Sequence, residues 1–102
     1  MTDSVTISVQ FAKALADETR QKIMMLCCCQ WRSVGDIVTM LSVAQSTVSH
    51  HLSILKAVGL VKSRREGKQV FYRLDQQKIA ANCCLLAEHF APEHEIGLEK
   101  SE

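Results

Sequence analysis

Residues 45–74 read QSTVSHHLSILKAVGLVKSRREGKQVFYRL, and this stretch decides the fold of the chain. Apolar residues recur at helical spacing in its first part, where Val48, Leu52 and Leu55 lie four and then three positions apart. Such periodicity is typical of a helix with one buried face. The pattern therefore predicts a helix over 45–57.

The second part of this stretch predicts a β-hairpin. Gly59 stands where a left-handed residue commonly ends a helix. Two extended runs follow, at 60–65 and 68–74, and the turn Glu66-Gly67 separates them. Runs rich in strand-forming residues on either side of a glycine-bearing turn are typical of a hairpin. We therefore expect the helix to lead directly into a hairpin.

The exposed sides of this helix and hairpin carry groups that suit DNA. Opposite its apolar stripe, the helix has small polar residues and a histidine, whereas a merely solvated face usually has long charged residues. Small polar groups can approach base edges and phosphates closely. Residues 56–73 contain six bases and one acid, a net charge of +5, which suits phosphate contacts. The expected DNA contacts are Gln45, Ser46, Thr47, Ser49, His50, Ser53, Lys62, Arg64, Arg65 and Lys68.

The rest of the chain predicts four more helices. An apolar segment at 5–16 and a periodic segment at 17–30 come first. Ser33 and Asp36 then have the spacing of a capping box and open a short third helix. The last helix covers 76–90 with Asp75 as its N-cap, and Asp17 stands at the N-cap of the second helix. Because a tight turn joins the short helix to the polar-faced helix, the two make a helix-turn-helix and the hairpin makes a wing. The predicted fold class is mainly α with a small β-hairpin, a winged helix-turn-helix.

Length and charge distribution bound the organisation of the chain. Its 102 residues suffice for one domain, which we place at 1–91. Residues 74–102 contain six acids and two bases, a net charge of −4, so the total of +1 hides a basic hairpin beside an acidic end. We expect 92–102 to be a flexible acidic tail. Apolar runs are too short for a membrane span and the N-terminus lacks a secretory pattern, so we expect a cytoplasmic protein without membrane contact.

The sequence argues against an enzyme. The motifs G-x-G-x-x-G, H-E-x-x-H and G-x-S-x-G and the P-loop are all missing from it. We therefore expect no catalytic residues and no obligatory cofactor. A winged helix that binds a protein partner, and no DNA, is the alternative from another class.

Three segments carry a resemblance to a known family. ALADETRQKIMMLC at 14–27, SVGDI at 33–37 and the stretch at 45–74 make residues 11–74 similar to the ArsR/SmtB family of bacterial winged-helix repressors. The resemblance implies a homodimer bound to a palindromic operator on double-stranded DNA. It also implies repression that is relieved when an inducer binds.

The resemblance implies a dimer interface built from the first and last helices, at 5–16 and 76–90. The residues fit such an interface, because the first helix is apolar around much of its surface and the last helix has a continuous apolar seam. The expected interface residues of this seam are Ile79, Cys83, Leu86 and Phe90.

Five cysteines without a secretory signal predict free thiols in a reducing compartment. They form two clusters, at 27–29 and 83–84. Soft thiolates suit As(III) and other thiophilic metal ions, so an inducer of this kind is expected. Two other interpretations stay open: thiol oxidation or persulfidation, and plain core packing. The candidate ligands are Cys83, Cys84, Cys28 and Cys29.

Metal-sensing members of the family have ligand patterns that this sequence lacks. The resemblance places a C-x-C pair of arsenic and cadmium sensors at positions where this chain has Ser33 and Gly35. Zinc sensors use paired ligands on the last helix, and the spacing of the donors differs here. Those donors are Asp75, His89, Glu93 and His94. Ala44 stands at the predicted N-cap of the polar-faced helix, where the family often has serine.

Overall fold

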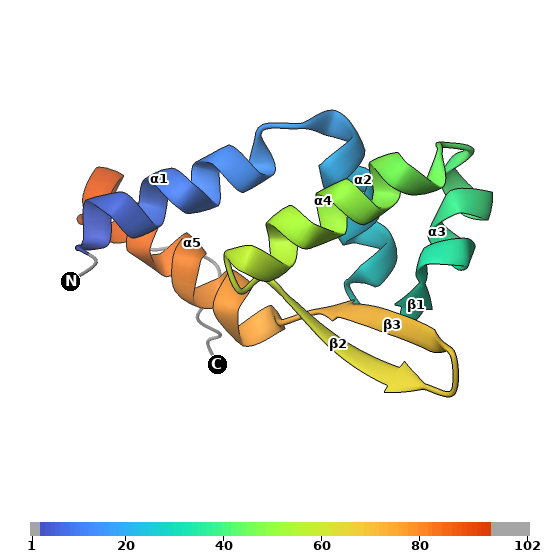
Figure 1. The fold of residues 1–102 in the computed structure, drawn as a ribbon. Helices are drawn as coiled ribbons and strands as arrows, with labels where there is room; N and C mark the ends of the chain where they lie inside the picture. The colour runs from blue at the N-terminus through green and yellow to red at the C-terminus, as the bar shows by residue number, and fades with distance from the viewer. Residues whose placement is uncertain (1–2, 95–102) are drawn as a thin grey trace.

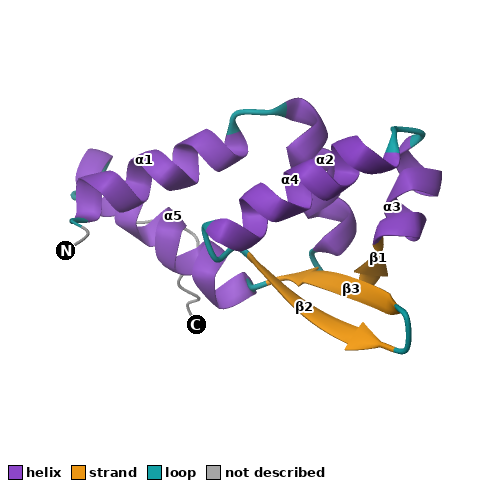
Figure 2. Ribbon diagram, viewed as in Figure 1, coloured by secondary structure: helices purple, strands orange, loops and turns teal. Residues whose placement is uncertain are grey.

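A computed structural model describes residues 3–94, and within them it contains five helices and one small sheet (Figures 1 and 2). The winged helix-turn-helix predicted from the sequence is confirmed. Of the predicted tail at 92–102, residues 95–102 lie outside the described part. The elements are α1 (Ser4–Leu15), α2 (Glu18–Cys27), β1 (Arg32–Ser33), α3 (Val34–Leu41), α4 (Gln45–Ala57), β2 (Val61–Glu66), β3 (Gln69–Leu74) and α5 (Gln76–Phe90). No helix in the described range is both long and apolar enough to cross a membrane.

Three of the helices, α2, α3 and α5, begin at the side-chain N-caps that the sequence predicts. At α2, Asp17 Oδ1 accepts a hydrogen bond from the backbone N–H of Arg20 at 2.9 Å. At α3, Ser33 Oγ accepts from the Asp36 N–H at 3.0 Å, and Asp36 Oδ2 accepts from the Ser33 N–H at 3.1 Å, which completes the capping box. Asp75 caps α5 in the same way. Each bond satisfies a donor that the first turn of a helix leaves unpaired.

The second helix is shorter than the sequence predicts. α2 ends at Cys27, and Cys28 is its C-cap, whereas periodicity favoured a helix to residue 30. The chain turns away because Arg32 pairs with Tyr72 of β3 and forms the short strand β1. Arg32 Nε also donates to the Leu26 carbonyl at 3.0 Å, which satisfies an acceptor in the last turn of α2.

The sheet contains the predicted hairpin and one strand that the sequence did not reveal. Its order is β1-β3-β2, and both pairings are antiparallel. In the hairpin, Val61 lies opposite Leu74 and Glu66 lies opposite Gln69. Gly67 in the turn has a φ of +64°, in the region that favours glycine.

The core lies where α2, α3 and α4 pack on the base of the hairpin. The apolar stripe predicted for α4 is confirmed, because its three residues are 0–1% exposed. Burying each such side chain stabilises the fold by about 1.5–3 kcal/mol. The largest fully buried side chains include Ile23, Ile37, Val48, Leu52, Leu55 and Leu60.

Helices α1 and α5 lie side by side at one end of the molecule, away from the hairpin tip (Figure 1). The seam predicted on α5 divides into two parts. Ile79, Cys83 and Leu86 are half-buried and pack against the chain's own core. Phe90 is 80% exposed. Several apolar side chains of α1 are exposed beside it, including Val5.

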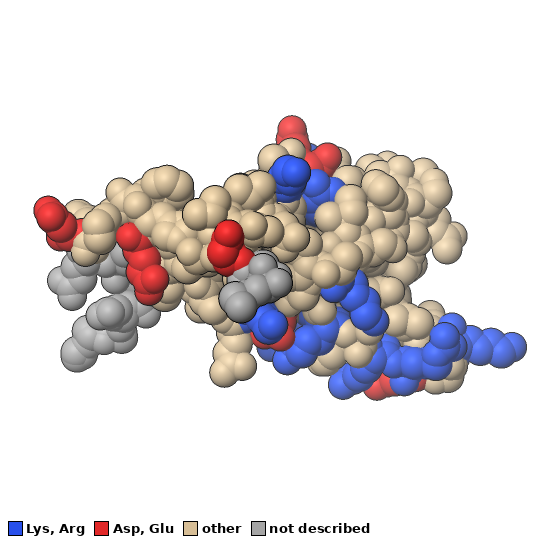
Figure 3. All heavy atoms as spheres, turned by 60° about the vertical axis from the view of Figure 1, so that its left-hand side comes forward, with Lys and Arg blue, Asp and Glu red and all other residues tan. Residues whose placement is uncertain are grey.

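Charge separates along the molecule as the sequence predicts. In Figure 3, lysine and arginine gather at the end where Figure 1 places the hairpin, whereas acidic groups are scattered, with several of them toward the α1–α5 end. Most of the basic side chains of the hairpin are exposed. The hairpin is therefore a positively charged projection.

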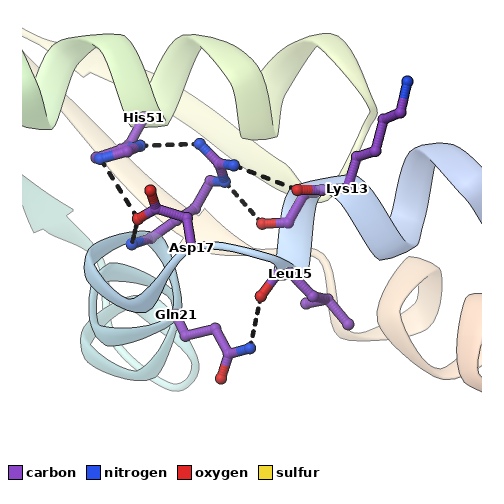
Figure 4. Close-up of polar contacts among 7 residues, drawn as sticks. Lys13, Leu15, Asp17, Gln21 and His51 are labelled. Atoms are coloured by element: carbon purple, nitrogen blue, oxygen red, sulfur yellow. Dashed lines mark hydrogen bonds and ion pairs between the residues drawn. The ribbon is translucent and has the colours of Figure 1, made fainter.

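A buried polar network joins α1, α2 and α4 (Figure 4). Arg20 is 9% exposed, and its Nε donates to the Ala14 carbonyl at 2.6 Å while Nη2 donates to the Lys13 carbonyl at 3.3 Å. Its Nη1 lies 2.9 Å from Nδ1 of His51, which is 8% exposed. On the other side of the ring, His51 Nε2 lies 3.7 Å from Asp17 Oδ1.

The environment of His51 keeps its ring neutral. Burial lowers the pKa of His51, the nearby Asp17 opposes this, and Arg20 and His50 add to the lowering. An arginine can only donate, so Nδ1 of His51 must accept from Arg20 and the ring proton must sit on Nε2, facing Asp17. The carboxylate stays charged, because the backbone N–H of Arg20 lowers the pKa of Asp17.

We expect Ala44→Ser to raise the free energy of unfolding by about 0.5–1 kcal/mol. Ala44 has an extended backbone at the N-cap of α4 and makes no side-chain cap hydrogen bond, so a serine hydroxyl could pair with a free N–H of the first turn. Urea denaturation followed by circular dichroism would measure the change. Ala44→Val is the control without a hydroxyl, and an equal gain in both variants would contradict capping.

We expect His51→Ala to lower the free energy of unfolding by about 1–3 kcal/mol at pH 7.5, because it leaves a buried donor of Arg20 unpaired. His51→Asn keeps an acceptor near the position of Nδ1 and should lose less. Urea denaturation of the three proteins gives both values. Equal losses in the two variants would contradict the role assigned to this hydrogen bond.

The same network predicts that the free energy of unfolding depends on pH. Since the folded pKa of His51 lies below its ordinary value of 6.5, the unfolded chain takes up the proton first. The contribution of His51 is therefore complete above pH 6.5 and is lost as pH falls through the folded pKa. The stability advantage of the wild type over His51→Asn should shrink between pH 7.5 and 5.5, and a constant difference would contradict this.

Candidate nucleic-acid interface

The turn between α3 and α4 sets the geometry of the helix-turn-helix. Ser42 ends α3 with a φ of +57°, and its N–H donates to the Val38 carbonyl at 2.9 Å. Residues 42–44 then reverse the chain, so that α4 packs across α3. A short turn of this kind holds two helices at a large angle.

The side of α4 that faces away from the core is polar and open, as predicted. Val48, Leu52 and Leu55 fill the opposite side of the helix. Ser53 Oγ donates to the Ser49 carbonyl at 3.0 Å, which leaves the hydroxyl oxygen exposed. The structure places all six predicted residues of this face on the surface. They are Gln45, Ser46, Thr47, Ser49, His50 and Ser53.

The hairpin places its predicted basic residues on the surface beside this face. Lys62, Arg65 and Lys68 are exposed and make no ion pair with another described residue. Arg64 is also exposed but is held in place, because its guanidinium lies 4.6 Å from the centroid of the Trp31 ring and its Nη2 lies 2.9 Å from Glu66 Oε2. Lys62, Arg65 and Lys68 are therefore freer than Arg64 to contact phosphates.

Two residues outside the predicted set of DNA contacts position the hairpin. Trp31 lies under Arg64, an arrangement worth about 0.5–1 kcal/mol at an exposed site. Lys56, in the last turn of α4, donates from Nζ to Ser63 Oγ of β2 at 2.5 Å. The Trp31–Arg64 contact joins segments distant from one another in sequence, and the Lys56–Ser63 bond links the end of α4 to the hairpin that follows it.

The cysteines fall into three environments. Cys27 is fully buried, and burial raises the pKa of its thiol to about 11. Cys28 is half-buried and Cys29 is exposed, with their Sγ atoms 2.7 Å apart. Cys83 is half-buried and Cys84 is exposed.

The structure does not bring the candidate ligands of one chain into one group. In the range 3–94, no three side chains of His, Cys, Asp or Glu are placed to hold a metal ion together. His89 instead lies between serines of α1, with Nδ1 3.3 Å from Ser8 Oγ and Nε2 3.2 Å from Ser4 Oγ. A site that combines thiolates of two chains stays a prediction.

An apolar depression of about 370 Å³ separates the exposed sides of α1 and α5. Val5, Val9 and Ala12 line it from α1, and Leu86 and Phe90 line it from α5. Exposed apolar patches of this kind are typical of interaction sites.

The chain is similar in sequence to known regulators. A family model described as bacterial regulatory protein, arsR family, matches residues 17–63, from the N-cap of α2 into β2. A cadmium resistance transcriptional regulatory protein CadC homolog of Staphylococcus aureus is 40% identical over 66% of this chain and 56% of its own length. The transcriptional activator HlyU of Vibrio cholerae is 37% identical over 78% of this chain and 73% of its own length. The arsenical resistance operon repressor of Escherichia coli is 38% identical over 70% of this chain and 62% of its own length.

The fold is shared as well. The solution structure of a homodimeric winged helix-turn-helix DNA-binding domain from Mycobacterium bovis, a possible ArsR-family regulator, superposes with a TM-score of 0.68 and 30% identity. The match covers 90% of this chain and 88% of that domain. Sequence and fold together show that this chain belongs to the arsR family of bacterial regulatory proteins.

Proposed function

We propose that this chain is a homodimeric repressor that binds a palindromic operator and releases it when a soft metal or metalloid binds its cysteine thiolates. The observation that carries the DNA-binding part is the open polar face of α4 beside a basic hairpin. In a winged helix-turn-helix, the second helix of the motif lies in the major groove and reads base edges. We therefore call α4 the recognition helix, and the hairpin contacts the flanking backbone or minor groove.

The positive charge of the hairpin supplies affinity that depends on salt. Each neutralised phosphate releases counterions, and binding weakens as salt rises. Lys62, Arg65 and Lys68 are exposed and are not paired with acids in the described structure, which suits this role. The recognition helix supplies short hydroxyl, amide and imidazole groups, which suit base contacts.

A second copy of the chain is the occupant proposed for the depression between α1 and α5. The apolar side chains Val5, Val9 and Phe90 are 62%, 46% and 80% exposed in one chain. A domain of this size gains stability when such a surface is covered. The homodimeric state of the related Mycobacterium bovis domain supports a second copy of the chain as the partner. Two recognition helices then meet successive major grooves about 34 Å apart.

A thiophilic inducer is supported by the five cysteines and by relatives named for cadmium and arsenical resistance. Ligand binding at α5, where Cys83 and Cys84 lie, would shift the helix pair of the dimer and the spacing of the recognition helices. A preference of about 3 kcal/mol for the shifted dimer weakens operator binding more than a hundredfold.

A thiol-redox or persulfide-responsive repressor is the second candidate. It is favoured by the short distance between the Cys28 and Cys29 sulfurs, 2.7 Å. Hydrogen peroxide would oxidise the two thiols to a disulfide and itself be reduced to two waters. A polysulfide would instead transfer one sulfane sulfur to a thiolate, which becomes a persulfide, and would leave as a polysulfide one sulfur shorter.

We expect Lys68→Ala to weaken binding to a labelled fragment of the protein's own promoter. Removing one phosphate contact per chain, and so two per dimer, should lower the slope of log Kd against log salt by about 1.8. Fluorescence anisotropy over a salt series measures both values. Lys22→Ala is the matched control, because it also removes one exposed lysine but lies on α2, where Lys22 pairs with Glu18. A wild-type protein that binds no DNA at low salt would contradict the proposal and favour a protein partner.

We expect arsenite to release the promoter fragment at a stoichiometric dose from the reduced protein. The variant Cys28→Ser/Cys29→Ser/Cys83→Ser/Cys84→Ser should bind DNA normally and stay bound, since Cys27 alone remains and is buried. The same anisotropy assay measures release. Protein that resists arsenite and cadmium but is released by peroxide or polysulfide would replace the metal proposal with the second candidate.

A further inference from the structure

The two pairs of adjacent cysteines differ in geometry. Each pair has one half-buried and one exposed member, but Cys83 and Cys84 lie within α5, where successive side chains point about 100° apart. Cys28 is the last residue with helical backbone at the end of α2, and Cys29 has already left the helix. The change of backbone direction turns both side chains to the same side, and their Sγ atoms lie 2.7 Å apart. Among residues 3–94, this is the one pair of sulfurs within hydrogen-bond distance of each other.

An open depression adjoins this pair. It has a volume of about 230 Å³ and is lined by Met24, Met25, Gln21, Leu74 and Cys28. Met25 is 73% exposed, so a large flexible apolar side chain remains in solvent at the rim. Methionine adapts its shape and offers a polarizable sulfur to a neighbouring group. The volume lies below the range typical of drug-sized ligands and suits one small organic group.

The pair has no third ligand within the described chain. Cys27 is the nearest cysteine in sequence, but it is fully buried in the core. No group of three metal-binding side chains forms anywhere in residues 3–94. Arsenite has three positions that exchange with thiols and is best held by three sulfurs. A trivalent arsenic that already has one bond to carbon has only two.

We propose that Cys28 and Cys29 form a dithiol site for monosubstituted trivalent arsenicals, R–As(OH)₂, whose organic group lies against Met24 and Met25. Two As–S bonds form and two As–O bonds break. The two thiol protons leave with the two hydroxyl groups as two waters, while arsenic stays trivalent and the As–C bond is unchanged. Capture itself does not need DNA; its regulatory consequence rests on the proposed function.

The site is connected to the parts of the molecule proposed to bind DNA and the second chain. Gln76 Nε2, in the first turn of α5, donates to the Cys28 carbonyl at 2.8 Å and lies 3.9 Å from Cys29 Sγ. Two residues after Cys29, Trp31 lies under Arg64 of the hairpin. An arsenic bridge between the sulfurs redirects the Cys29 side chain, so it acts on both contacts.

The test uses phenylarsine oxide, which hydrates in water to a phenyl arsenical with two hydroxyl groups. The reduced full-length protein is titrated with it, and intact mass is measured. We expect one phenylarsenic unit in place of two thiol hydrogens. Cys28→Ser/Cys29→Ser should lose this adduct, and the matched control Cys83→Ser/Cys84→Ser should keep it. Circular dichroism establishes that both variants are folded, which we expect because none of the four residues is fully buried.

Trp31 gives a second readout, because it is the only tryptophan in the chain. Its fluorescence should change and saturate at one arsenical per chain in the wild type, and should not change in Cys28→Ser/Cys29→Ser. A chelate on two sulfurs should survive an excess of the monothiol glutathione and be removed by a small dithiol. An adduct removed by glutathione, or one that persists in Cys28→Ser/Cys29→Ser, would overturn the dithiol site.

The outcomes separate this site from the proposed function. Adduct formation by mass and fluorescence supports the site whether or not the protein binds DNA. Release of promoter DNA by phenylarsine oxide from the wild type and from Cys83→Ser/Cys84→Ser, but not from Cys28→Ser/Cys29→Ser, would support regulation through it. Arsenite-driven release without any phenylarsenic adduct would overturn the dithiol site and leave the repressor proposal standing.

Discussion

One buried arginine determines how the recognition helix lies on the rest of the molecule. A charged group can be buried only where its donors are satisfied. Arg20 meets this condition with the carbonyls of Lys13 and Ala14 at the end of α1 and with the ring of His51 on α4. Its own backbone N–H is held by Asp17. Three helices are therefore fixed to one guanidinium, and none of them can shift alone without leaving a buried donor unpaired.

This constraint has a consequence for regulation. α1 takes part in the surface proposed for the second chain, and α4 has the face proposed for DNA. Because Arg20 joins the C-terminal end of α1 to His51 in the middle of α4, a movement of the α1–α5 pair of the kind proposed above would reach the recognition helix through hydrogen bonds as well as through apolar contact. A hydrogen bond has a narrow range of good geometries, so such bonds are either made or broken. This property suits the two dimer geometries of the proposed repressor, one with operator bound and one released.

Local sequence patterns predicted most of the fold, but they did not predict contacts between residues far apart in the sequence. The caps at Asp17, Ser33 and Asp75 and the periodicity of α4 depend on residues within one or two turns, so the sequence alone predicted them. β1 has only two residues and exists because it pairs with β3 far along the chain, which no periodicity announces. The burial of His51 could have been predicted, because a residue three positions after Val48 lies on the same apolar side of the helix. No sequence pattern predicted the contact between the Cys28 and Cys29 sulfurs, because this contact depends on where α2 ends.

The end of α2 links these findings. Periodicity favoured helix through residue 30, and in that case Cys28 and Cys29 would point apart as helical neighbours do. β1 pairing and the bond from Arg32 to the Leu26 carbonyl end the helix at Cys27. The same early end brings the two sulfurs together and carries Trp31 to the hairpin, where it meets Arg64. The wing therefore takes its position from the turn that also creates the thiol pair, so chemistry at the sulfurs and the placement of the wing share one short segment of backbone.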